Sequence, residues 1–124
     1  MLRHTTLLFA GVVHYARLDP TYHAAFLALT CLSLIRHWCE KVPYAVVQLD
    51  RAAARACFAL CAYTHLLEHP SAWGGACLAT VLGLWAYECH TKNDWRRAHA
   101  LLHLISVGGA LLAVRARSLH SFLG

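Results

Sequence analysis

Long apolar segments with few charged residues constrain the fold of this chain more than any other feature. Hydrophobic residues make up 59% of the sequence and Asp, Glu, Lys and Arg only 14%, against about 45–50% and 25% in an average soluble domain. A small soluble domain has a large surface that polar side chains must cover. The sequence therefore predicts a membrane protein. A soluble all-α domain with a very apolar core is the alternative.

Loop-forming residues divide the chain into five apolar segments. A membrane-spanning helix needs about 20 mostly apolar residues, and most of these segments approach that length. We expect one all-α membrane domain over residues 1–124, a polytopic bundle of four to five transmembrane helices. The first segment is short and contains His14, so it either spans or lies at the interface. The expected helices cover residues 5–18, 21–39, 44–67, 72–87 and 96–114.

Basic residues predict the orientation of this bundle. The formal net charge is +5, but Lys and Arg form no stripe with interleaved aromatic residues, so nucleic acid is not an expected partner. Cytoplasmic loops carry an excess of Lys and Arg. This rule favours a multi-pass protein with its N-terminus on the cytoplasmic side. With five spans, one side holds Arg3, Arg36, Lys41, Lys92, Arg96 and Arg97, and the other holds Arg17, Arg115 and Arg117.

The six cysteines mostly lie inside apolar segments and form no CxxC motif. We expect them to be small buried hydrophobic residues rather than disulfide partners.

Five polar residues within the expected helices are candidate functional residues, because ionisable groups at membrane depth are costly. Ser33 and His37 are four residues apart, as are His99 and His103, so each pair lies on one helix face. Asp50 lies near the start of the third helix. The alternation of helix directions brings all five groups to the same end of the bundle. Three histidines and a water form a common catalytic zinc arrangement.

Histidine pairs alone are weak evidence, because a chain with 10 histidines in 124 residues contains such pairs by chance. The stretch His65-Leu-Leu-Glu68-His69 even matches the H-x-x-E-H pattern of some zinc peptidases. It ends a helix against Pro70, and the chain lacks the large soluble domain of such enzymes. We expect His65 and His69 to be interfacial residues.

The order of the five candidates resembles the CREST superfamily of membrane hydrolase-like proteins. That superfamily includes the alkaline ceramidases, the adiponectin and progestin receptors, and the hemolysin III family. The resemblance rests on Ser33-x3-His37, on Gln48-Leu-Asp50, and on the ceramidase-like stretch His99-Ala-Leu-Leu-His103-Leu-Ile-Ser-Val-Gly-Gly109. Leu84-Trp85 with Glu88 faintly resembles a Trp-plus-acid motif of the family. Family members have seven spans, whereas this chain has room for five, and it lacks an N-terminal acidic cluster for calcium.

The resemblance implies roles for these residues. His37, His99 and His103 would be zinc ligands, Asp50 would bind the water at the metal, and Ser33 would assist that water or the substrate carbonyl. The implied function is a zinc-dependent hydrolase of a lipid amide or ester, with the bilayer and a lipid substrate as partners. Because two helices are missing relative to the family, a homo-oligomer or a larger membrane complex could complete the bundle.

Two other functions compete with this hypothesis. The chain could be a structural or accessory membrane subunit without chemistry. It could also be a haem-binding electron-transfer protein, with axial ligands drawn from His14, His23, His37, His65 and His103. Arg51 and Arg55 are expected to snorkel, or to pair with Asp50 or with lipid phosphates.

Overall fold

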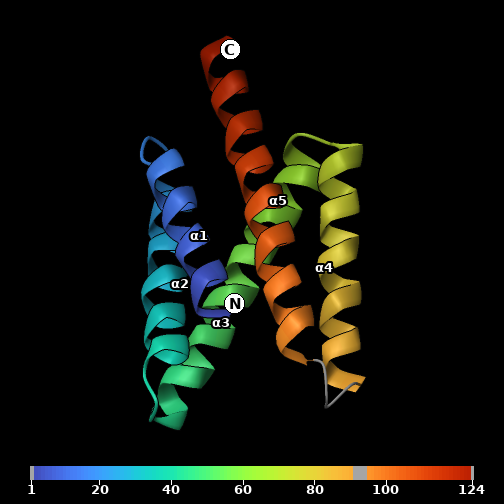
Figure 1. Cartoon of the computed structure of the whole chain (residues 1–124). Coiled ribbons are helices and arrows are strands. Elements are labelled where there is room, and N and C mark those ends of the chain that lie inside the picture. The colour runs from blue at the N-terminus through green and yellow to red at the C-terminus, as the bar shows by residue number, and fades with distance from the viewer. Residues whose placement is uncertain (1, 91–94, 124) are drawn as a thin grey trace.

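The computed structural model describes residues 2–90 and 95–123 and forms an all-α bundle of five helices (Figure 1). Helix α3 is followed directly by a π-helical turn, η1. The expected all-α class is therefore confirmed. The elements are α1 (Leu2–Tyr15), α2 (Pro20–Trp38), α3 (Tyr44–Tyr63), η1 (Thr64–Glu68), α4 (Ala72–His90) and α5 (Trp95–Leu123).

Local signals explain where several helices begin. Asp19 caps α2 by accepting a hydrogen bond from the backbone N–H of Tyr22 (3.4 Å), and Pro20 occupies the first turn. Pro43 likewise precedes α3. Helix α4 continues through Glu88 to His90, although we expected it to end at residue 87.

Helix α5 is longer than the expected 96–114, because Arg115 and Arg117 do not end it. Arg is a good helix former, and no Gly or Pro follows until Gly124. The region expected to be helical over 44–67 changes to π-helix at Thr64. The loop residue Lys92, used to predict the orientation, lies outside the described residues.

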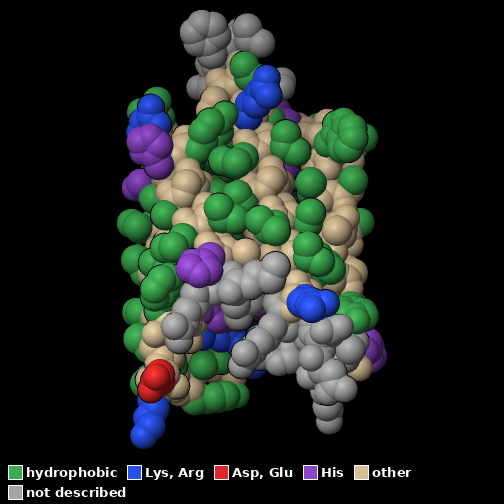
Figure 2. All heavy atoms as spheres, viewed as in Figure 1, with side chains coloured by type: hydrophobic (Ala, Val, Ile, Leu, Met, Phe, Trp, Pro, Cys, Tyr) green, Lys and Arg blue, Asp and Glu red, His purple; other side chains and the backbone are tan. Residues whose placement is uncertain are grey.

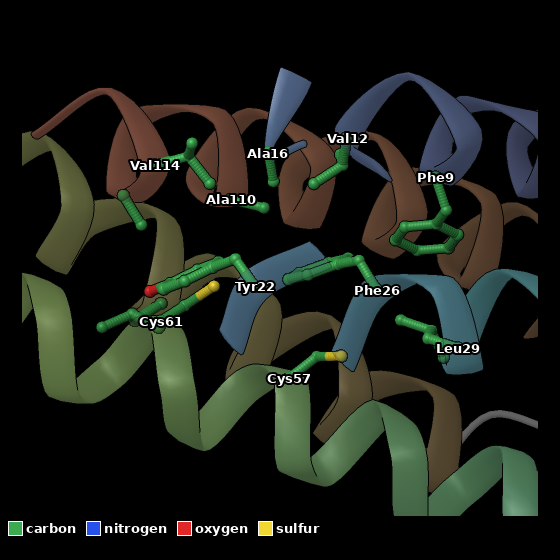
Figure 3. Close-up of a cluster of buried hydrophobic side chains, with 12 residues drawn as sticks. Phe9, Val12, Ala16, Tyr22, Phe26, Leu29, Cys57, Cys61, Ala110 and Val114 are labelled. Atoms are coloured by element: carbon green, nitrogen blue, oxygen red, sulfur yellow. The ribbon is translucent and has the colours of Figure 1, made fainter. Parts of the chain in front are cut away.

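The apolar core lies where α1, α2, α3 and α5 meet, and Leu78 of α4 joins it (Figure 3). Phe9 and Val12 of α1 pack there with Tyr22 and Phe26 of α2. The hydroxyl of Tyr22 donates a hydrogen bond to the carbonyl oxygen of Leu60 (3.0 Å). Helix α1 packs against α2 and α5, and α4 packs against α5, whereas α3 makes few contacts with α4 and α5. This weak packing leaves room for a cavity.

One helical stretch among the described residues, Arg97–Leu119, is long and apolar enough to cross a membrane. This is weak evidence by itself, since the core helix of a soluble protein passes the same test. The other helices are shorter or more polar than this stretch. Helix α1 has 14 residues, and α3 carries Asp50, Arg51 and Arg55.

Nonetheless, the surface is rich in large apolar side chains. Leu18 is 88% exposed, Trp73 78% and Leu67 73%. On the face shown in Figure 2, hydrophobic side chains cover the middle of the bundle, and the visible Lys, Arg, Asp and Glu side chains lie towards its two ends.

All six cysteines are free and lie in the described part of the chain. Cys57 and Cys61 are buried as expected, and Cys77 is partly buried. Cys31, Cys39 and Cys89 are exposed, so the expectation of burial was wrong for these three in the isolated chain.

Candidate metal centre

His37, His99 and His103 come together at one end of the bundle. One potential ligand nitrogen from each histidine lies within 4.8 Å of those of the other two. The ring centroids of His37 are 5.4 Å from His99 and 5.7 Å from His103, and those of His99 and His103 are 4.5 Å apart. His103 is buried and the other two are partly buried. This group could hold a metal ion.

Helix topology explains the convergence. Helix α2 ends where α3 begins, α3 and α4 run away and back, and α5 then starts at the same end (Figure 1). His37 lies in the last turn of α2, and His99 and His103 lie in the first turns of α5. The four-residue spacing puts both α5 imidazoles on one helix face.

Two further side chains orient the imidazoles. Nδ1 of His99 lies 2.8 Å from Oε1 of Glu88 on α4, so it donates a hydrogen bond to that carboxylate. Nδ1 of His103 lies 3.1 Å from Oγ1 of Thr5 on α1. With Nδ1 engaged, Nε2 is the nitrogen that each ring can present to a metal. Metal-binding histidines almost always have such a partner on their other ring nitrogen.

The donor set suits zinc, which binds imidazole nitrogens and in catalytic sites keeps a position open beside three protein ligands. Zn–N bonds are about 2.0–2.1 Å long. Ligation therefore requires a small inward rotation of the rings from their present spacing.

Ser33 and Asp50 lie together, joined across α2 and α3. The hydroxyl of Ser33 donates a hydrogen bond to Oδ1 of Asp50 (2.5 Å), and both residues are buried. The guanidinium of Arg36 forms an ion pair with Oδ2 of Asp50 (2.8 Å). We expected Arg51 or Arg55 as possible partners of this carboxylate. Arg36 is the partner instead because it lies on α2, one turn after Ser33, which also bonds to Asp50.

The candidate residues border one cavity of about 610 Å³. Its wall includes Ser33, Asp50, His99 and His103, so a molecule in the cavity could reach the hydroxyl, the carboxylate and two of the imidazoles. The remaining lining is mostly apolar, with Phe26, Phe58, Leu78, Val81 and Trp85 among its residues.

Sequence reasoning assigned no role to three residues of this site: Thr5, Arg36 and Glu88. Glu88 had a signal, since it follows Trp85 and lies 11 residues before His99. Thr5 had none, because it is 98 residues away from His103 in the chain.

None of the other histidines whose side chains the structure describes joins this group. His65 is 1% exposed, and its Nε2 donates a hydrogen bond to the carbonyl oxygen of Gly109 (2.8 Å). The expectation that His65 is interfacial was therefore wrong. Nε2 of His69 lies 3.5 Å from Oε1 of Glu68. Nδ1 of His23 lies 3.0 Å from the carbonyl oxygen of Val13. His37, His99 and His103 are the one possible metal-binding group found among the described residues.

The haem alternative gains no support from these positions. Haem ligation by two histidines places the porphyrin between two imidazoles. His14 is exposed and His65 is bonded to a backbone carbonyl, while the rings of His37 and His103 lie near each other with a third imidazole beside them.

Comparisons with known protein families, with curated proteins and with solved structures find no match for this chain. Its assignment therefore rests on the residues and their geometry.

The hydrogen bond from His99 to Glu88 leads to a prediction about metal affinity. We expect Glu88→Gln and Glu88→Ala to weaken zinc binding by about 10–100-fold, because the carboxylate orients the imidazole and raises its basicity. Competition titration against a chromophoric chelator measures this change. Glu40→Gln, an exposed residue at the same end of the bundle, is the matched control and should bind zinc like the wild type. Unchanged affinity in both Glu88 variants would contradict the assigned role.

Proposed function

We propose that this chain is an integral membrane, zinc-dependent hydrolase of a lipid amide or ester, and a shortened relative of the CREST superfamily. The observation that carries the proposal is the convergence of His37, His99 and His103 beside a cavity that Ser33 and Asp50 also line. Their order in the chain is the order on which the resemblance rests.

The surface supports a location in the bilayer. Soluble monomers rarely expose contiguous apolar patches of more than a few hundred Å², whereas large hydrophobic side chains are exposed on every helix of this bundle. The apolar middle and charged ends visible in Figure 2 fit a bundle of four to five spans. In this orientation the N-terminus and the metal site face the cytoplasm, as the distribution of basic residues predicts.

Zinc at such a site would polarise a carbonyl and make a water more nucleophilic. Asp50 would hold the attacking water and accept its proton at a carboxylate oxygen. Arg36 and Ser33 fix this carboxylate through one hydrogen bond to each oxygen. Each carboxylate oxygen accepts more than one hydrogen bond, so Asp50 keeps the capacity for this role. The Ser33 hydroxyl lies beside it and could donate to the oxygen of the substrate carbonyl.

The substrate would enter laterally between α3 and α4. Arg51 and Arg55 on α3 and Leu82 and Trp85 on α4 line the cavity and are also exposed. The cavity therefore reaches the surface between the two helices that pack weakly against each other. An acyl chain lying in one leaflet could slide into such an opening.

Replacing Asp50 tests the chemistry separately from metal binding. In phosphatidylcholine vesicles containing a fluorescent N-acyl sphingosine or a fluorescent monoacylglycerol, we expect zinc-loaded wild-type protein to release fatty acid. Asp50→Asn should lower the rate by about 10²–10⁴-fold, as for loss of a general base, while binding zinc normally. Glu40→Gln is again the control. Zinc-loaded protein that hydrolyses neither lipid class would favour the structural-subunit alternative, and full activity of Asp50→Asn would contradict this mechanism.

A further inference from the structure

The cavity is elongated along the bundle. Its lining runs from Asp50 to Cys61 on α3 and from His99 to Gly109 on α5. At a rise of 1.5 Å per residue, these stretches correspond to about 15–16 Å. Its volume of about 610 Å³ falls within the range of small-molecule sites.

The two ends of this cavity differ in chemistry. The end at the start of α3 is bordered by Asp50, Arg51 and His99, with Glu88 nearby on α4. Towards the other end the wall is mostly apolar, formed by Phe58, Cys61, Leu78 and Val81 among others, with His65 as a polar lining residue. A molecule that fills the cavity therefore needs a polar head and an apolar body.

Arg51 and Arg55 give the polar part of the cavity its charge. They are one helical turn apart on α3 and lie on the same helix face, so both line the cavity. Within the described part of the chain neither guanidinium has an ion-pair partner, whereas Arg36 is paired with Asp50 and Arg117 with Asp19 and Glu68. The carboxylate of Glu88 accepts a hydrogen bond from Nδ1 of His99. With the imidazoles neutral, the cavity-lining arginines Arg36, Arg51 and Arg55 outnumber the carboxylates of Asp50 and Glu88 by one, so the polar part of the cavity carries a net positive charge.

The position of these two exposed arginines along α3 favours an anionic ligand if the bundle lies in a bilayer as proposed. Arg55 lies 11 residues after the start of α3 at Tyr44, which is about 16 Å along a helix and half of a hydrocarbon core of about 30 Å. An arginine at that depth is costly, and such residues face cavities and mark ligand pathways.

We propose that the cavity binds a single-chain amphiphile with a phosphate headgroup, which Arg51 and Arg55 recognise while the acyl chain fills the apolar end. Guanidinium groups form paired hydrogen bonds with phosphate oxygens. A phosphate monoester carries about −1.5 to −2 charges at neutral pH, which matches two guanidiniums better than a single carboxylate does. This inference rests on the proposed function, because it names the lipid class that reaches the metal site.

Equilibrium binding measurements in a neutral detergent test this lipid specificity. Each lipid is present at the same mole fraction in the micelle. The probes are 1-oleoylglycerol 3-phosphate, oleate, uncharged 1-oleoylglycerol, glycerol 3-phosphate and inorganic phosphate. We expect the phosphorylated amphiphile to bind at least about tenfold more tightly than any other probe, because charged hydrogen bonds are the strong ones. Arg51→Gln/Arg55→Gln should remove this preference. Arg115→Gln, an exposed arginine at the other end of α5, should retain it.

The outcomes separate this inference from the proposed function. If 1-oleoylglycerol binds as tightly as its phosphate, or the double variant keeps the preference, the inference is overturned and the arginines only contact bilayer headgroups. If inorganic phosphate binds as tightly as the amphiphile, the site is an anion site without lipid specificity, which also overturns it. If the wild-type protein prefers the phosphorylated amphiphile but is unable to bind zinc, the result would support lipid binding and refute the hydrolase.

Discussion

Purified wild-type protein loaded with zinc is expected to retain about one ion per chain, and His103→Ala is expected to lose it. The three imidazoles are the whole protein donor set of the proposed site, so removing one leaves two ligands. Loss of a ligand should weaken affinity more than the roughly 10–100-fold that follows loss of an orienting partner. His37→Ala and His99→Ala should behave in the same way. Elemental analysis after gel filtration measures the retained metal.

The control for these variants is His14→Ala, which removes an exposed histidine and should leave the zinc content unchanged. Helix content measured by circular dichroism shows whether each variant is folded. A wild type that binds no zinc would refute the metal centre. Full zinc retention by a folded His103→Ala would show that the metal lies elsewhere.

The Gly74→Ala substitution is expected to destabilise the fold strongly. Gly74 is buried on α4, and a methyl group there would overlap the ring of His65. That ring cannot move away easily, because it is 1% exposed and bonded to Gly109 on α5. Overpacking of this kind costs about 1–3 kcal/mol or more. Thermal unfolding in detergent should therefore show a clearly lower midpoint.

The neighbouring Gly75 provides the matched control. A Cβ at Gly75 would meet nothing within 4 Å, and Ala is a better helix former than Gly by about 1 kcal/mol. Gly75→Ala should therefore unfold at the wild-type temperature or slightly above it. In the Gly74→Ala background, His65→Ala should restore part of the lost stability by making room for the methyl group. Equal unfolding temperatures for Gly74→Ala and Gly75→Ala would contradict this account of the contact between Gly74 on α4 and His65 on η1.

The helices and the convergence of the histidines could be predicted because both depend on local information. Apolar segments separated by residues such as Pro20 and Pro43 define the helices. The alternating direction of successive helices then determines which helix ends meet. The end of α5 was missed because Arg115 and Arg117 signal the end of a membrane span but are compatible with a continuing helix.

The partners of the site residues could not be predicted in the same way. Whether Arg36 or Arg51 reaches Asp50 depends on the rotation of α2 and α3 about their axes, which no spacing rule sets to the required accuracy. Thr5 contacts His103 because α1 packs beside α5, a neighbour relation between the first and last helices. Glu88 reaches His99 because α4 continues past residue 87.

The contact between the first and last helices has a consequence for biosynthesis. Thr5 leaves the ribosome 98 residues before His103, and α1, α2 and α3 are made before either α5 histidine exists. His37 therefore lacks both partner imidazoles until α5 has been translated. Metal loading can only follow synthesis of α5, so a chain that already includes His103 is the first species that can carry the ion at this site. A ribosome-bound chain truncated before His99 should accordingly bind no zinc at this site.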